Sequence, residues 1–223
     1  LAPRGAPVVI AGFGPAGMFC ALTLARAGLR PIVLERGKDV GARTAAVAAF
    51  RAGGALDAEC NVQFGEGGAG TFSDGKLNTG THDKRITHVL REFYNHGAPK
   101  SVTYDAKPHV GTDVLSRVVK SIREEIILLG GEVRFGSKLS GLVLDESGAV
   151  SGARVVSGGV EYVQECSSLV LATGHSARDT FEMLLGTGVP MEAKAFSMGA
   201  RIEHLQAELD LTQYGVPRGK RLP

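Results

Sequence analysis

One segment near the start of the sequence constrains the fold more than any other. A short apolar run, residues 7–11, precedes GFGPAG at residues 12–17, and a helix-prone stretch follows from Met18 to Ala27. A second apolar run, residues 31–34, then ends at Glu35. This order predicts a strand, a glycine turn, a helix and a second strand, which is the context that gives a G-x-G-x-x-G sequence its meaning.

The residues of this turn have known structural roles in a βαβ unit that binds a dinucleotide. Gly12 permits the tight turn, Gly14 lets a diphosphate approach the backbone, and Gly17 lets the helix pack closely on the strand. Pro15 suits the first helical turn, where its missing N–H is not needed. Glu35 is placed to accept hydrogen bonds from a ribose and disfavours a 2′-phosphate. The alternative is an ordinary tight turn between strand and helix that binds no ligand. The motif alone is equally compatible with NAD and FAD.

A second glycine-rich segment, FGEGGAGTFSDGKL at residues 64–77, first suggests a P-loop. Gly70 to Lys76 matches G-x-x-x-x-G-K, but Leu77 stands where a P-loop needs Ser or Thr to hold magnesium. The residues after Lys76 are loop-like, and the later apolar run ends in Ala172 where a Walker B strand would carry Asp. We therefore interpret the segment as bare backbone that lies against a flat or anionic ligand, with a flexible surface loop as the alternative.

The rest of the sequence predicts further helices. Apolar spacing or alanine content indicates helices over residues 43–51, 83–95, 112–129 and 180–185. Thr112 or Asp113 is the expected cap of the third. The interval 99–110 has no period and is expected to be an extended connection.

Alternating apolar residues predict strands in the second half of the sequence. A strand at 132–135 precedes runs at 141–145, 149–157 and 160–165, which predict a three-stranded antiparallel meander. Residues 169–172 are expected to return to the parallel sheet and to end at Thr173-Gly174 beside the dinucleotide. Residues 194–203 are expected to form a strand that opens a second domain.

These segments together resemble a known family. NVQFGEGGAGTFSDGKL at residues 61–77, with the turn at 12–17, resembles the uncharacterised bacterial FAD-dependent dehydrogenases, which belong to the glutathione-reductase-like flavoproteins with two dinucleotide-binding domains. PHVGTD at 108–113 and ATGHSARD at 172–179 are similar to further motifs of that family. The resemblance implies an α/β, Rossmann-like FAD-binding domain over residues 1–178, without its later flavin-binding segment. Residues 179–223 are then the beginning of a substrate domain.

The motifs and the resemblance give the expected FAD contacts. These are Gly12, Gly14, Pro15, Ala16, Gly17, Glu35, Arg36, Arg43, Gly68, Ala69, Gly70, Thr71, Lys76, Leu139, Ala172, Thr173 and Gly174. By resemblance, Lys138 and Leu139 present backbone to the adenine. Arg36 and Arg43 could meet the adenosine or the diphosphate, with a solvent-exposed arginine as the alternative for each.

Residues that would act on the flavin are harder to assign from the sequence. Lys76 is the first candidate, because a cation near the ring favours the anionic reduced form, although SDG before it also fits a solvated turn. His175 and Arg178 are weaker candidates beside the sheet end. No catalytic base is assigned, since linear spacing shows no apposed acid and base.

Composition limits the classes of function. The 223 residues carry a net charge of +2 and offer no basic patch for a nucleic acid. The longest apolar runs are shorter than the ~20 residues of a membrane span. Cys20, Cys60 and Cys166 form no C-x-x-C pair, so neither a metal site nor a disulfide framework is expected. We expect a cytoplasmic protein with a small-molecule substrate.

Two functional classes follow from the sequence. The first is an oxidoreductase in which FAD accepts a hydride from an organic substrate or from a nicotinamide, with NAD(P)H as a candidate donor. The second is a non-catalytic FAD-binding module, or a flavoprotein that modifies RNA or a metabolite with flavin in a structural role. A simple NAD dehydrogenase would be colourless and fits the second glycine segment poorly.

Overall fold

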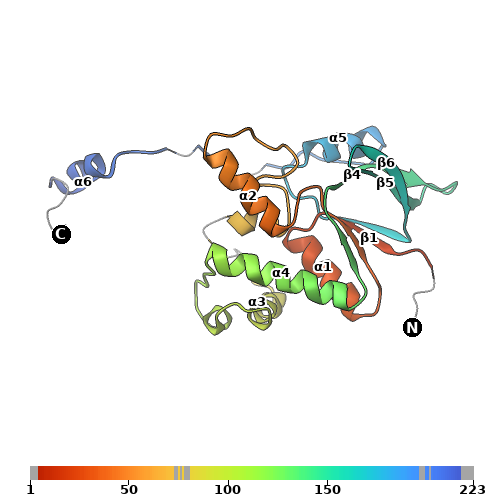
Figure 1. Cartoon of the computed structure of the whole chain (residues 1–223), viewed down its shortest axis with the longest axis horizontal. Helices are drawn as coiled ribbons and strands as arrows, with labels where there is room; N and C mark the ends of the chain where they lie inside the picture. The colour runs from red at the N-terminus through yellow and green to blue at the C-terminus, as the bar shows by residue number, and fades with distance from the viewer. Residues whose placement is uncertain are drawn as a thin grey trace. The chain divides into compact units, whose positions relative to one another are not determined.

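The computed structural model describes residues 5–72, 75, 77, 81–195, 199–200 and 202–216. The chain divides into two compact units, Leu1–Val189 and Pro190–Pro223. In the described part of the chain, the second unit contains one helix, α6 (Gln206–Tyr214), and every other element belongs to the first unit (Figure 1).

A parallel four-stranded sheet forms the centre of the first unit. Its order is β3-β2-β1-β7, and neighbouring strands are parallel throughout. The strands are β1 (Val8–Ala11), β2 (Ile32–Leu34), β3 (Glu132–Arg134) and β7 (Ser168–Leu171). The central strand β1 is an unbroken apolar run because helices and a second sheet cover its two faces. The predicted βαβ start and the predicted return of residues 169–172 to this sheet are confirmed.

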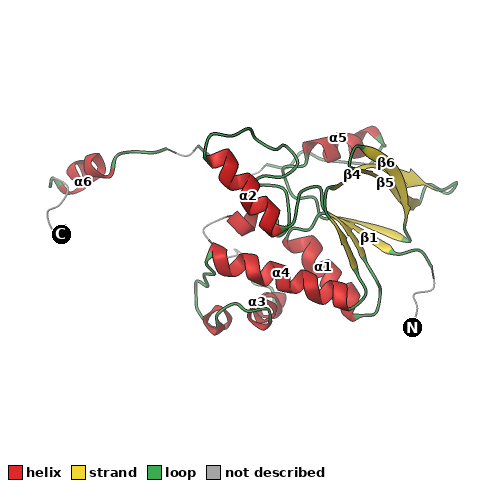
Figure 2. Cartoon of the chain, viewed as in Figure 1, coloured by secondary structure: helices red, strands yellow, loops and turns green. Residues whose placement is uncertain are grey.

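Helices cover one face of the parallel sheet. Helix α1 (Pro15–Arg26) connects β1 to β2, α4 (Thr112–Leu128) precedes β3, and both pack on this face beside α3 (Arg85–Asn95) (Figure 2). Ile10 and Val33 point into this layer, and Phe19 of α1 meets Phe93 of α3 edge-on with ring centroids 5.6 Å apart. The apolar spacing predicted for α4 is confirmed, because Leu115, Val118, Val119, Ile122 and Ile126 lie in this core. Of the α3 residues, Val89 and Phe93 pack there, whereas Ile86 and Leu90 line a cavity.

The antiparallel meander packs on the opposite face. It consists of β4 (Ser137–Leu144), β5 (Val150–Ser157) and β6 (Val160–Glu165), as predicted. Val9 and Ala11 of β1 point into this second core, because successive side chains of a strand face opposite sides. Helix α5 (Arg178–Gly186) contacts β4 and contributes to the same layer.

A further helix and two short turns belong to the first unit. Helix α2 (Val40–Arg51) follows β2, and Asp39 caps it by accepting hydrogen bonds from the N–H groups of Gly41 and Ala42. Two 3₁₀ turns, η1 (Ala69–Phe72) and η2 (Lys100–Thr103), complete the first unit.

Three predictions about these elements are wrong. Helix α4 is capped by Gly111 rather than by Thr112 or Asp113, because the extended backbone before the helix is at Gly111 and its carbonyl accepts from Leu115 N at 2.8 Å. The interval 99–110 contains η2 instead of being wholly extended. The described residues within 194–203 lie in no strand, and Ile202 there is 75% exposed, so this side chain lacks the burial that stabilises a strand. No helix in the described part of the chain is both long and apolar enough to cross a membrane.

Candidate functional site

In the glycine turn after β1, the packing of the protein requires glycine at two of the three motif positions and does not require it at the third. At Gly12 a methyl group would overlap the Ala172 carbonyl oxygen, and at Gly17 it would overlap the Gly12 carbonyl oxygen. At Gly14 the nearest atom to a methyl group would be Gly68 Cα at 3.7 Å, which is an ordinary contact. The backbone at Gly14 is extended and suits any residue. The protein alone therefore explains the first and third glycines of the motif but not the second.

The same turn leaves backbone donors without partners. Gly12 N–H donates to the Leu34 carbonyl and Phe13 N–H to Glu35 Oε2, each at 2.8 Å. Within the described residues, no acceptor meets the N–H groups of Gly14, Ala16 or Gly17. These are donors at the start of α1, where Pro15 has none and the helix places a partial positive charge. The arrangement suits a diphosphate.

The second glycine segment lies directly against this turn. We call residues 65–71 the glycine ribbon. Gly67 N–H donates to the Phe13 carbonyl at 2.9 Å, and a methyl group on Gly68 would lie 3.0 Å from Gly14 Cα and 3.2 Å from Pro15 Cδ. The two segments are distant in sequence but touch, so one extended ligand can contact both. The structure therefore brings together two segments that were both expected to contact FAD.

The ribbon itself presents one open donor. Ala69 is exposed, and no described residue accepts from its N–H. Thr71, by contrast, is buried and its hydroxyl donates to the Glu66 carbonyl at 3.3 Å. The Thr71 side chain therefore stabilises the ribbon from inside, while Ala69 offers its backbone outward.

Glu35 is a junction of three backbone segments. The residue is 4% exposed, and its carboxylate accepts from Phe13 N–H at 2.8 Å, Gly37 N–H at 2.8 Å and Gly65 N–H at 2.9 Å. A carboxylate has about four lone-pair positions, so one remains after these three bonds. The ribose contact stays a prediction, and the part that Glu35 plays in joining the turn to the ribbon was missed from the sequence.

Arg36 forms ion pairs at the edge of the site. Its Nε donates to Glu59 at 2.7 Å, and its two Nη atoms donate to Asp179 at 2.9 and 2.8 Å. The guanidinium also lies 4.2 Å from the ring centroid of Phe64. Hydrogen bonding from Arg36 lowers the pKa of Glu59 and that of Asp179. Lys138, which was expected near the adenine, pairs with Glu59 at 3.1 Å.

Arg43 is fully buried, so the solvent-exposed alternative is wrong for this residue. Among the described residues, its guanidinium donates only to backbone carbonyls of residues 61–68. Burial lowers its pKa to about 10. Five carbonyls accept from it, those of Asn61, Val62, Gly65, Glu66 and Gly68. The sequence signal for this role is an arginine surrounded by alanines in a helix, because such a side chain can reach a loop packed on that helix.

A buried ion pair holds the ribbon from the other side. Glu66 is 0% exposed, and its Oε2 accepts from Val40 N–H at 2.7 Å. Glu66 Oε1 lies 2.8 Å from Arg123 Nε of α4, an ion pair whose orientation falls short of a hydrogen bond. Burial raises the pKa of Glu66. This pair was also missed, because nothing in linear spacing joins residues 66 and 123.

Ala172, Thr173 and Gly174, three of the remaining expected contacts, follow β7. Ala172 N–H extends the pairing with β1 by donating to the Ala11 carbonyl at 2.8 Å, and Thr173 and Gly174 follow it. The Leu139 side chain is buried in the core under the meander. His175 and Arg178 are exposed beside this strand end. Lys76 lies outside the described residues.

An apolar cavity of about 710 Å³ borders the turn and the ribbon. Pro15, Ala16, Gly67 and Gly70 form the edge that it shares with them. Its other walls come mainly from α1, α3 and α4, through Phe19, Ile86, Val89, Leu90, Leu115 and Val119. The volume and lining are those of a small-molecule pocket.

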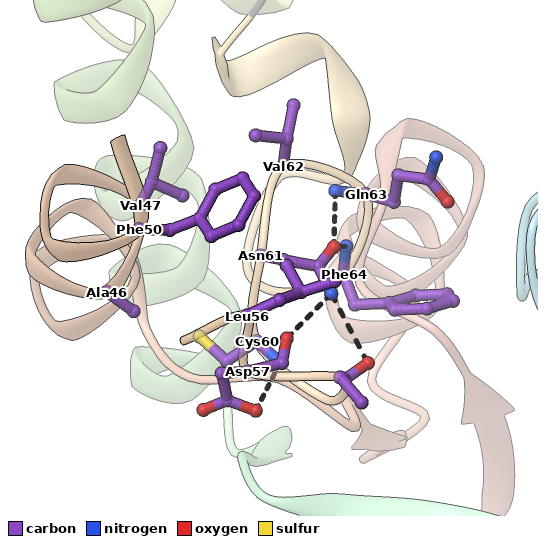
Figure 3. Close-up of a pocket in the computed structure, with 11 residues that line it drawn as sticks. Ala46, Val47, Phe50, Leu56, Asp57, Cys60, Asn61, Val62, Gln63 and Phe64 are labelled. Atoms are coloured by element: carbon purple, nitrogen blue, oxygen red, sulfur yellow. Dashed lines mark hydrogen bonds between the residues drawn. The ribbon is translucent and has the colours of Figure 1, made fainter. Parts of the chain in front are cut away.

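A smaller pocket of about 400 Å³ lies between α2 and residues 56–64 (Figure 3). Asn61 organises this loop: its side-chain oxygen accepts from Gln63 N–H at 2.8 Å, and its side-chain nitrogen donates to the Asp57 carbonyl at 2.8 Å. These bonds fix the stretch whose carbonyls face Arg43. Within the described residues, no group of three or more His, Cys, Asp or Glu could hold a metal ion.

Comparisons with known proteins agree with this geometry. Residues 7–68 match the FAD binding domain family. The chain is 53% identical over 216 residues to an uncharacterized protein of Clostridium beijerinckii, an alignment that covers 95% of this chain and 39% of that protein. The chain thus spans well under half the length of this relative.

Two solved structures share the fold at low sequence identity. Thermovibrio ammonificans THI4 is 19% identical with a TM-score of 0.53, over 83% of this chain and 64% of that one. The 3-ketosteroid-Δ4-(5α)-dehydrogenase of Rhodococcus jostii is 18% identical with a TM-score of 0.50, over 78% and 47%. The chain therefore shares its fold with these two structures, and residues 7–68 carry the signature of an FAD binding domain. To this extent the resemblance predicted from the sequence is confirmed.

Proposed function

We propose that this protein is an FAD-dependent oxidoreductase. The observation that carries the proposal is the contact between the glycine turn and the glycine ribbon, because these two segments hold the open N–H groups of Gly14, Ala16, Gly17 and Ala69. Open backbone donors at a helix N-terminus suit the diphosphate of a dinucleotide. The match to the FAD binding domain family favours FAD over NAD.

In this proposal, different residues of the site would hold different parts of the dinucleotide. The diphosphate would accept from the open donors, and Gly14 would give it room where the fold needs no glycine. The ribose would use the free lone pair of Glu35, and the backbone at Leu139 would meet the adenine. Ala172, Thr173 and Gly174 would border the same ligand from the neighbouring strand. Arg36 would close the adenosine end through its ion pairs rather than contact the diphosphate.

Bound FAD would supply the redox chemistry by accepting a hydride from an organic substrate or a nicotinamide. The chain's own residues would bind and orient it, and the apolar cavity would exclude water beside it. We further propose that residues 1–178 form the FAD-binding domain and that residues 179–223 begin a substrate domain. A cytoplasmic location, a small-molecule substrate and NAD(P)H as donor belong to the same proposal.

The test is a spectral titration of the purified full chain with FAD, compared with FMN, NAD and ATP. We expect FAD to bind most tightly and to acquire a resolved flavin absorbance band at 1:1 saturation. Anaerobic addition of NADH or NADPH, followed by a panel of organic donors, should bleach that band. Bound flavin that resists every donor would support a non-catalytic module instead, and tighter binding of ATP or NAD than of FAD would contradict the proposal.

A further inference from the structure

The guanidinium of Arg43 is the shared partner of the loop before the ribbon and of the ribbon itself. Nε donates to the Asn61 carbonyl at 2.9 Å and Nη2 to the Val62 carbonyl at 3.0 Å. Nη1 lies 2.7 Å from the Glu66 carbonyl and 2.8 Å from the Gly68 carbonyl. One side chain of α2 thereby fixes the direction of several peptide groups that have no regular secondary structure to fix them.

These bonds determine which side of the ribbon carries donors. In a planar trans peptide, the C=O of one residue and the N–H of the next point in opposite directions. Because the Gly68 carbonyl points to Arg43, the N–H of Ala69 points away from Arg43. Ala69 is an exposed residue, and its N–H has no acceptor among the described residues. Arg43 therefore orients the open donor of the ribbon without reaching the surface itself.

A single residue, Gly65, links Arg43 to Glu35. Gly65 donates its N–H to Glu35 Oε1 at 2.9 Å, and its carbonyl accepts from Arg43 Nη1 at 3.3 Å. A side chain at Gly65 would overlap Arg43 Cδ, so the residue is packed tightly against the guanidinium. Glu35 and Arg43 therefore hold the two consecutive peptide groups on either side of the Gly65 Cα.

We propose that Arg43 is a positioning residue for the diphosphate of the bound dinucleotide. It acts through the glycine ribbon, whereas Glu35 acts on the adenosine end. The inference rests on the proposed function and assigns the affinity for different parts of the ligand to two side chains. If the Arg43 contacts are lost, binding of ligands that contain the diphosphate should weaken, and binding of adenosine should not change. If the Glu35 charge is lost, binding of both kinds of ligand should weaken.

The conservative variant Arg43→Lys tests this division. Lysine keeps the positive charge but has three donors on one nitrogen, so it cannot reproduce the planar set of contacts. Arg51→Lys is the matched control, because it makes the same change in the same helix at an exposed position. Calorimetric titration of the full chain with ADP and, separately, with adenosine gives the two affinities. We expect Arg43→Lys to weaken ADP binding about tenfold or more and to change adenosine binding less than twofold.

Two further variants complete the test. Glu35→Gln should weaken ADP and adenosine by a similar factor. Phe72→Leu removes the ring that lies 4.7 Å from the Arg43 guanidinium and should loosen Arg43 without deleting it. We expect a smaller, ADP-selective loss, about two- to fivefold. If Arg43→Lys does not fold, as judged by circular dichroism and a melting curve, Phe72→Leu still shows whether ADP binding is weakened more than adenosine binding.

The outcomes separate this inference from the proposed function. Equal loss of ADP and adenosine affinity in Arg43→Lys or Phe72→Leu would show a merely structural role and overturn the inference. Unchanged ADP affinity in Arg43→Lys would overturn it too. If the unmodified chain binds neither FAD nor ADP, the proposed function fails before the role of Arg43 is reached.

Discussion

At the scale of single residues, the glycines of the first turn differ in what requires them. Gly12 and Gly17 have backbone atoms where a side chain would be, so they are needed whether or not a ligand is present. Gly14 has space for a methyl group and an ordinary extended backbone. A glycine that the fold does not need, next to three open backbone donors, indicates that another molecule approaches this point closely.

This difference predicts contrasting effects of two substitutions. Gly14→Ala should change the free energy of unfolding by less than about 1 kcal/mol yet reduce FAD affinity at least tenfold, because the methyl group takes the place of the diphosphate. Gly17→Ala should destabilise the protein itself by about 2 kcal/mol or more. Urea denaturation of the ligand-free chain and FAD titration separate the two effects. Undiminished FAD binding by Gly14→Ala would show that the diphosphate lies elsewhere.

At the scale of elements, a polar network ties three helices together beneath their apolar contacts. Arg26 of α1 pairs with Glu92 of α3 at 3.0 Å and with Glu125 of α4 at 2.6 Å. His96, just after α3, reaches Glu125 at 2.8 Å. The pKa of Glu92 and that of Glu125 are both lowered, chiefly by hydrogen bonding from Arg26. The network thereby anchors α3, one wall of the apolar cavity, to the helices that support the glycine turn.

Replacing Glu92 by glutamine should lower stability in a pH-dependent way. Its side chain is only 6% exposed, and we expect a loss of about 1–2 kcal/mol at pH 7. A carboxyl whose pKa is lowered by folding stabilises the native state above its unfolded pKa of about 4.3, and this contribution disappears as the pH falls through the folded value. The difference between the two proteins should therefore narrow below about pH 4.

Urea denaturation at pH 7 and at pH 3 measures this difference. Glu124→Gln is the matched control, because Glu124 is 62% exposed on the same helix as Glu125 and pairs only weakly with Lys120 at 3.9 Å. It should change stability by less than about 0.5 kcal/mol at either pH. A Glu92→Gln effect that is the same at both pH values would contradict the proposed contribution of the ionised carboxylate.

At the scale of the whole molecule, the first unit is a three-layer structure. Helices α1, α3 and α4 cover one face of the parallel sheet, and the meander covers the other (Figure 2). The layers meet at β1, whose alternate residues enter opposite cores. Strand β7 matters to both layers and to the site, because it pairs with β1 and its continuation packs against Gly12.

Truncation should reveal that the first unit folds by itself. A chain that ends at Val189 keeps both cores and the candidate site, and we expect its melting temperature to stay within about 2 °C of that of the full chain. A chain that ends at Glu165 lacks β7 and exposes one side of β1, so it should show no cooperative transition. Circular dichroism melting curves check both. A non-cooperative transition in the longer truncation would contradict the independence of this unit.

The sequence by itself determined the elements whose signals are local. The glycine turn, the apolar periods of α3 and α4, and the alternating strands of the meander depend on neighbours a few residues away, and the resemblance to FAD-dependent flavoproteins followed from contiguous motifs. Only the tertiary structure decided what Arg43, Glu66 and Glu35 do, because their partners are carbonyls, amides and a guanidinium distant in sequence. Packing also decided that Gly14 is free of the protein while Gly12 and Gly17 are not. Such roles depend on tertiary contacts between residues that are far apart in sequence, and the spacing of residues along the chain does not specify those contacts.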